Sequence, residues 1–146
     1  MAAHNYYIGG LIGYSNSTIS NSAATGNVNA VFGGYTGGFI GYAAGGTVSA
    51  SYATGSVTAG DYGYDDNAGF IGVNYAPITN SYSTGTVTLA QSWYSGGLVG
   101  QNHANIGNSY SSSNITVSSG PPPAETGPPP IPIASAAWLA TMSPAI

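Results

Sequence analysis

Three of the four acidic side chains of this sequence gather in one short segment, and they are the first candidates for chemistry. Asp61, Asp65 and Asp66 are followed directly by Asn67, and carboxylate and amide oxygens at this density are ligands that Ca²⁺ accepts. Their spacing does not match an EF-hand loop, and the segment is equally typical of a solvated loop. Calcium binding and a solvated loop therefore both stay open, and no other metal and no cofactor is predicted.

Catalysis is not expected from the remaining polar residues. The chain contains no Lys, Arg or Cys and only four acidic residues, whereas enzymes that cleave polysaccharides need paired carboxylates or a carboxylate beside a basic group. His4 and His103 fall in no recognisable arrangement with a serine and an aspartate. The sequence therefore predicts that this protein is not an enzyme.

The composition also excludes two classes of partner. Only 3% of the residues are charged and the formal net charge is −4, so no basic surface can neutralise nucleic-acid phosphates or attach to anionic lipid. No segment reaches the roughly 18 apolar residues of a membrane helix, since residues 131–142 are too few and include Pro132. We expect neither nucleic-acid binding nor membrane insertion.

Two triplets match the acceptor pattern for N-glycosylation. They begin at Asn16 and Asn114, each followed by a hydroxyl residue two positions later. A surface with so few charges needs another source of hydration, and sugars would supply it. Covalent or bound glycans are therefore predicted partners, although such triplets also arise by chance in a chain rich in Ser and Thr.

An internal repeat indicates which elements position these residues. Four segments open with a similar block, in which Gly or Ala is followed by a glycine, two hydrophobic residues and another glycine. The glycine before the hydrophobic pair recurs at positions 10, 38, 69 and 97, a period of 28 to 31 residues. The repeats are rich in Gly, Ser, Thr, Asn, Tyr and Val, which favours short strands and turns over helices. The fold class predicted is all-β, a parallel β-solenoid of about four coils. Each coil should hold strands equivalent to residues 11–14, 19–25 and from 28 onward.

Stacked coils place equivalent residues in columns about 4.8 Å apart. Four apolar columns are expected, and at least three should face the core: Leu11, Phe39, Phe70, Leu98; Ile12, Ile40, Ile71, Val99; Ile19, Val48, Ile78, Ile106; and Val28, Val57, Val87, Ile115. A stacked ladder is predicted for Tyr52, Tyr82 and Tyr110, above Ala23 in the first coil. Asn21, Asn80 and Asn108 share a column with Ala50 and could hydrogen-bond along the stack. A serine column aligns without exception, at Ser22, Ser51, Ser81 and Ser109.

The repeated blocks resemble a known family. Residues 96–102 read Gly-Gly-Leu-Val-Gly-Gln-Asn, and residues 78–87 read Ile-Thr-Asn-Ser-Tyr-Ser-Thr-Gly-Thr-Val; together these are similar to the GLUG repeat. The resemblance covers about residues 8–117 and implies a scaffold without catalytic residues. Proteins with this repeat are typically secreted or surface-attached in bacteria and archaea, some of them adhesin-like, so the resemblance implies an extracellular or cell-surface prokaryotic protein.

The chain changes character after the repeats. We expect a solenoid over residues 1–119, a polyproline linker over 120–132 and an apolar tail over 133–146, because proline ends strand pairing and favours an extended arm. The tail is either a frayed terminus or a docking segment. In the second case its assembly residues are Ile133, Trp138, Leu139 and Met142.

These features lead to three functional hypotheses. The first is a structural subunit of an extracellular filament or surface fibre, with itself as partner, because the stack has no recognisable cap and no charged residue to block its open edges. The second is an adhesin fragment that binds glycan or a host surface through the tyrosine ladder and its Thr and Asn columns. The third is ice binding through two Thr-rich columns, Thr25, Thr54, Thr84, Ser112 and Asn29, Thr58, Thr88, Thr116.

Overall fold

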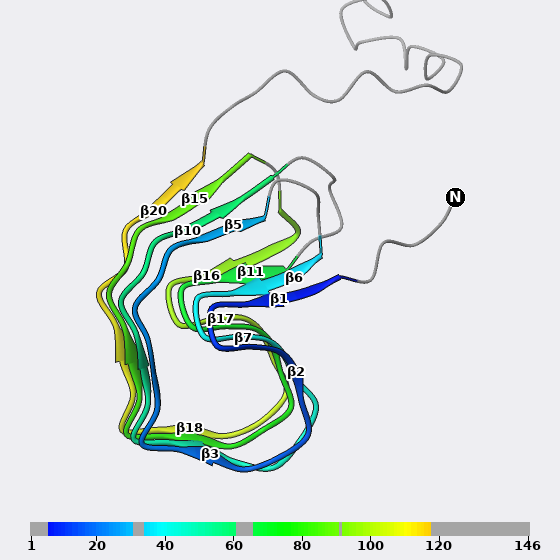
Figure 1. The fold of residues 1–146 in the computed structure, drawn as a ribbon, viewed down its shortest axis with the longest axis vertical. Coiled ribbons are helices and arrows are strands. Elements are labelled where there is room, and N and C mark those ends of the chain that lie inside the picture. Colours follow the sequence, from blue (N-terminus) through cyan, green and yellow to red (C-terminus); the bar gives the residue numbers. More distant parts are fainter. Residues whose placement is uncertain (1–5, 31–33, 61–65, 91, 118–146) are drawn as a thin grey trace, which may run out of the picture.

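The chain folds as a parallel β-solenoid of four coils (Figure 1). The computed structural model describes residues 6–30, 34–60, 66–90 and 92–117. These residues form twenty short strands and no helix, and the strands build five parallel four-stranded sheets. The all-β solenoid predicted from the repeat is therefore confirmed.

Every coil contributes one strand to each of the five sheets. The first coil holds β1 (Tyr7–Gly9), β2 (Ile12–Ser15), β3 (Ile19–Ser20), β4 (Ala23–Ala24) and β5 (Val28–Ala30). The second holds β6 (Tyr35–Gly37), β7 (Ile40–Ala43), β8 (Val48–Ser49), β9 (Tyr52–Ala53) and β10 (Val57–Ala59). The third holds β11 (Asp66–Ala68), β12 (Ile71–Asn74), β13 (Ile78–Thr79), β14 (Tyr82–Ser83) and β15 (Val87–Leu89). The fourth holds β16 (Tyr94–Gly96), β17 (Val99–Asn102), β18 (Ile106–Gly107), β19 (Tyr110–Ser111) and β20 (Ile115–Val117).

The register between coils follows the sequence repeat. Val57 pairs with Val28 on one side and with Val87 on the other, and Val87 pairs in turn with Ile115. The longer connection before the third coil does not shift this register, because Asn67 still pairs with Thr36. Seen along the stack, the coils therefore trace nearly the same outline (Figure 1).

The core lies inside the coils and is completed only in the middle of the stack. All four apolar columns are buried in the second and third coils, where the Phe39 and Phe70 rings stack with centroids 4.7 Å apart. Most members of these columns are more exposed in the end coils: Leu11 is 43% exposed in the first coil, and Ile106 and Ile115 are 40% and 46% exposed in the fourth, whereas Val28 of the first coil stays buried at 7%. A coil on both sides therefore increases the burial of most, but not all, of the column residues.

The strand pattern within a coil differs from the sequence prediction in two places. A strand that the sequence analysis did not expect, Tyr7–Gly9 and its equivalents, precedes the Gly-rich block. The stretch 19–25, predicted as one strand, is split into two because Asn21 has φ 50°. The equivalent residues are also left-handed, at Ala50 (φ 47°), Asn80 (φ 50°) and Asn108 (φ 45°). Each coil therefore turns a corner at this column.

Ala50 is the weak member of the corner column. A left-handed backbone costs an L-residue roughly 1–2 kcal/mol, and Asn tolerates it better than Ala. The variant Ala50→Asn should therefore raise the free energy of unfolding by about 1 kcal/mol in urea denaturation. It would also place an amide between Asn21 and Asn80.

The variant Ala50→Gly is the matched control, because glycine relieves the backbone strain without adding an amide. A larger gain for Asn than for Gly measures the contribution of amide contacts along the column. If Ala50→Asn unfolds at the same or a lower urea concentration than the wild type, the strain assigned to this corner is wrong.

Candidate functional site: side-chain ladders and the two open ends

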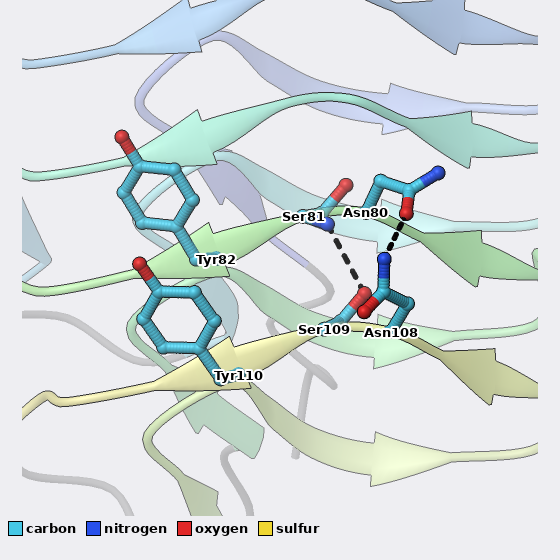
Figure 2. Close-up of a pocket in the computed structure, with 6 residues that line it drawn as sticks. All are labelled: Asn80, Ser81, Tyr82, Asn108, Ser109 and Tyr110. Atoms are coloured by element: carbon cyan, nitrogen blue, oxygen red, sulfur yellow. Dashed lines mark hydrogen bonds between the residues drawn. The ribbon is translucent and has the colours of Figure 1, made fainter.

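The corner between the third and fourth strands of each coil carries the side chains that the sequence singled out. In the last two coils, Asn80, Ser81 and Tyr82 lie directly over Asn108, Ser109 and Tyr110 (Figure 2). These six residues line a shallow pocket on the outside of the stack. The corner therefore presents three parallel columns, of amides, hydroxyls and phenols.

The tyrosines of β9, β14 and β19 stack as a ladder. The centroids of Tyr52 and Tyr82 are 5.1 Å apart with ring planes 6° from parallel, and those of Tyr82 and Tyr110 are 5.3 Å apart at 7°. Each inner ring therefore has its faces covered by the neighbouring coils and presents its edge and hydroxyl outward. Tyr110 ends the ladder and is 59% exposed. At the other end of the column lies Ala23, paired with Tyr52.

The asparagine column forms a hydrogen bond at one step only. The Asn108 side-chain amide donates to Asn80 Oδ1 (Figure 2). Asn21 is separated from this pair by Ala50, which has no amide, so the three asparagines do not form one continuous ladder. The left-handed backbone gives a second reason for Asn at this column, besides amide bonding.

The serine column is a ladder in its own right, which the sequence analysis aligned but assigned no role. Each serine N–H donates to the hydroxyl of the serine in the next coil: Ser22 to Ser51 (3.2 Å), Ser51 to Ser81 (3.3 Å) and Ser81 to Ser109 (3.1 Å). Each hydroxyl in turn donates to the backbone carbonyl two residues earlier, at 2.8–2.9 Å. The serines thus satisfy the corner N–H groups, and the ladder has a direction, from the first coil to the fourth.

Removing one serine hydroxyl tests this role. Ser81 is buried, and Ser81→Ala leaves the Ser51 N–H without its acceptor, so the free energy of unfolding should fall by about 1–3 kcal/mol. Ser22→Ala is the control, because Ser22 lies in the first described coil and no N–H of the described residues donates to its hydroxyl. Equal losses for the two variants in monomeric protein would contradict the ladder.

A second aromatic cluster lies where the chain doubles back between β1 and β2 (Figure 1). Tyr7 of β1 contacts Tyr14 of β2 and Tyr42 of β7, with ring centroids 5.4 and 5.2 Å apart. Tyr14 stacks on Tyr42 with the two ring planes 9° from parallel. Tyr42 also contacts Tyr75, which stacks on His103 at 4.3 Å. The sequence analysis missed this cluster because it joins different columns: Tyr14 and Tyr42 are register partners, but Tyr7 comes from another column and meets them only across the fold.

The phenol of Tyr42 makes this cluster sensitive to high pH. Burial raises its pKa above the ordinary value of 10, and Tyr75 adds to the rise through repulsion between phenolates and a hydrogen bond. The unfolded chain therefore loses this proton first. The stabilisation is complete below pH 10 and is lost as the pH rises through the higher pKa of the folded state.

We expect urea denaturation between pH 9 and pH 11.5 to show a steeper loss of stability for the wild type than for Tyr42→Phe. The phenylalanine variant keeps the ring contacts and has no proton to lose. If the two proteins lose stability in parallel over this range, Tyr42 does not contribute to the pH dependence.

The proposed calcium ligands are described only in part. Asp66 is buried on β11, and Asp61 and Asp65 lie outside the described residues. In the described ranges, no three side chains among His, Cys, Asp and Glu are grouped in a way that could hold a metal ion.

The remaining predicted sites are divided between surface positions and undescribed ones. The two glycosylation candidates, Asn16 and Asn114, are exposed. The linker 120–132 and the assembly residues Ile133, Trp138, Leu139 and Met142 lie outside the described residues. No helix in the described part is long and apolar enough to cross a membrane.

Comparison with known families explains the repeated geometry. The GLUG motif matches residues 4–29, 32–58 and 91–116, just over half of the chain. The chain belongs to the GLUG-motif family. No curated protein and no solved structure matches it. The third coil lies outside the matched residues, yet its strands β11–β15 pair with both neighbouring coils, so the GLUG coil geometry extends over it.

In the described part of the chain, the sheets and side-chain ladders stop at the two ends of the GLUG stack. Among the described residues, the first coil offers one face of five strands and the fourth coil offers another, and each face pairs with a coil on its inner side only. Neither end coil contains Asp, Glu, Lys or Arg. Charged residues are a common means of blocking an open strand edge, and this means is not used here.

Proposed function

We propose that this GLUG protein is a structural subunit of an extracellular filament or surface fibre, in which copies stack head to tail through the open ends of the solenoid. The observation that carries the proposal is the contrast between inner and end coils. Val57 and Val87 are completely buried, whereas Ile115 in the same column is 46% exposed. A further coil on the end would bury Ile115 as the inner coils bury Val87.

Open ends favour an assembly that continues. Solenoids that stay monomeric usually carry polar capping repeats, and each end coil here repeats the apolar columns of the inner coils. The two ends are different surfaces, so contact between them is heterologous and gives a fibre unless the rotation closes a ring. In this proposal, residues 133–146 act as a latch between subunits and covalent or bound glycans hydrate the uncharged surface. The extracellular prokaryotic location follows from the GLUG resemblance.

A glycan-binding adhesin is the second candidate, and the position of the aromatic rings bears on it. Sugar rings pack on exposed aromatic faces, but the inner faces of the Tyr52–Tyr82–Tyr110 ladder are covered by one another. Tyr14 and Tyr75 of the second aromatic cluster are about half exposed and suit a glycan better. Ice binding has weaker support, because the column of Thr58 and Thr116 begins with Asn29.

Assembly can be measured directly. At micromolar concentration the full chain should sediment as polymers, and electron microscopy should show fibres with an axial rise of about 19 Å per subunit, since four coils are each about 4.8 Å thick. A protein that sediments as a monomer under these conditions contradicts the proposal.

A charge placed on the open edge should block assembly. Ile115→Lys puts an ammonium group among the apolar side chains that the next coil would cover, so the variant should sediment as a folded monomer. Thr116→Lys is the matched control, because Thr116 follows the outward column of Thr58 and Thr88. It adds the same charge on the outer surface of the stack, outside the apolar columns, and should still polymerise, and circular dichroism should show that both variants fold.

A further inference from the structure

We infer the polarity and register of the subunit junction: the fourth coil of one copy seats on the first coil of the next, in the same register that joins coils within a chain. In this junction, Gly26 is the position that has to lack a side chain. The inference rests on the proposed function, and it adds which surfaces meet and how they are aligned.

The first argument comes from the glycine column at the turn after the tyrosine ladder. A Cβ on Gly55 would overlap the carbonyl oxygen of Gly26, and a Cβ on Gly85 would overlap that of Gly55. In each case the obstacle is the backbone of the preceding coil. In the second and third coils, glycine at this column therefore leaves room for the backbone of the coil that comes before it.

Gly26 has no such requirement within its own chain. A Cβ at Gly26 would meet nothing within 4 Å. Its backbone does not explain the glycine either, since the positive-φ glycines among the described residues are Gly34 and Gly46. A coil packed against the first coil would provide the reason, because its backbone would occupy the space where a side chain at Gly26 would point.

The fourth coil of a second copy fits this position. Its residue in the glycine column is Ser113, whose hydroxyl turns toward the inside of the stack and lies 3.4 Å from Ser83 Oγ. The Ser113 side chain therefore does not project into the junction. Gly26 of the next copy would face its backbone, as Gly55 faces Gly26.

The second argument comes from the hydrogen bonds that each end leaves open. Within the stack, the Asn21 N–H donates to the Ser49 carbonyl and the Tyr52 N–H donates to the Ser22 carbonyl. Continued across the junction, the first pattern joins the Asn108 N–H to the Ser20 carbonyl of the next copy. The second joins the Ala23 N–H of that copy to the Ser109 carbonyl.

The serine ladder fixes the polarity. Its N–H groups point from each coil toward the next, so the open groups are the Ser109 N–H at one end and the Ser22 hydroxyl oxygen, as acceptor, at the other. Two identical ends brought together would offer two donors or two acceptors at this column. Only the fourth coil on the first coil continues the ladder.

The side-chain columns agree with this register. It places Leu98 against Leu11 and Ile106 against Ile19, as Phe70 packs against Phe39 within the chain. It also places Tyr110, whose outer face is open, over Ala23, which is small enough to accept the ring without a clash.

Because the chain contains no cysteine, a pair of single-cysteine variants tests the junction. Asn29 and Thr116 occupy the outward column of β5 and β20, and adjacent coils in this column pair residue for residue. Facing Cα atoms about 4.8 Å apart fall within the range that a disulfide spans. Asn29→Cys and Thr116→Cys, mixed in equal amounts and oxidised with glutathione disulfide, should give the mixed dimer as the main product on a non-reducing gel.

Gly26→Val, added to the Asn29→Cys partner, tests the glycine. It should lower the mixed-dimer yield at least tenfold while the variant keeps its native circular dichroism and urea midpoint, because the space at Gly26 is open in the single chain. Gly45→Val is the matched control. Gly45 also has an open Cβ position, whose nearest neighbour is the Asn16 carbonyl oxygen at 4.0 Å, but it lies in an inner coil. This variant should cross-link like the parent.

The outcomes separate this inference from the proposed function. Dominant disulfide dimers of identical variants overturn the head-to-tail polarity on which both proposals rest. Undiminished mixed cross-linking of Gly26→Val overturns the role assigned to Gly26 at the junction. Fibres that form without any mixed disulfide overturn the register but leave the filament proposal standing. Absence of both fibres and cross-links overturns both proposals.

Discussion

The fold depends on one constraint, which is that every coil lies on its neighbour in register at the spacing of a parallel strand pair. The backbone donates in both directions between coils, as the Asn21 N–H to the Ser49 carbonyl and the Tyr52 N–H to the Ser22 carbonyl illustrate. A shift of one residue would turn the apolar columns outward and bring side chains against the carbonyls that Gly38 and Gly55 accommodate. The register is therefore set jointly by hydrophobic columns and by backbone contacts that only glycine permits.

The corners show how the chain keeps this stacking while changing direction. A left-handed residue such as Asn80 turns the chain, and the turned backbone no longer offers a carbonyl to the Ser51 N–H of the adjacent coil. The Ser81 hydroxyl takes the place of that carbonyl, and it donates its own proton to Thr79. The three successive residues at the corner therefore have separate roles. Asn tolerates the left-handed backbone, Ser provides an acceptor for an N–H of the adjacent coil, and Tyr stacks its ring on the equivalent ring.

The sequence predicted what an alignment of side-chain types shows, and it missed what depends on backbone conformation or on contacts between columns. The solenoid, its number of coils and the burial of Phe39 and Val57 follow from columns that can be aligned by eye, and the Tyr82–Tyr110 stack follows from the same alignment. The split after Ser20 was missed because a positive φ at Asn21 is a property of the backbone that Ala50 also adopts. The second aromatic cluster was missed because Tyr7 and Tyr42 belong to different columns and meet only when the chain doubles back.

The end coils keep most of the repeat where the stack stops, although Ala23 replaces the tyrosine and Ser113 the glycine of their columns. Leu11 and Ile115 keep apolar side chains at positions that are about half exposed, and Gly26 keeps a glycine where nothing in the described chain opposes a side chain. A monomer gains less from Leu11 and Ile115 than from their buried equivalents in the inner coils, because about half of each side chain is left in water, and the glycine raises the conformational entropy of the unfolded chain. A stack that continues through a second copy uses all of them in the way that the inner coils do. The same physical account then covers every coil, which is the main argument for placing a subunit at each end.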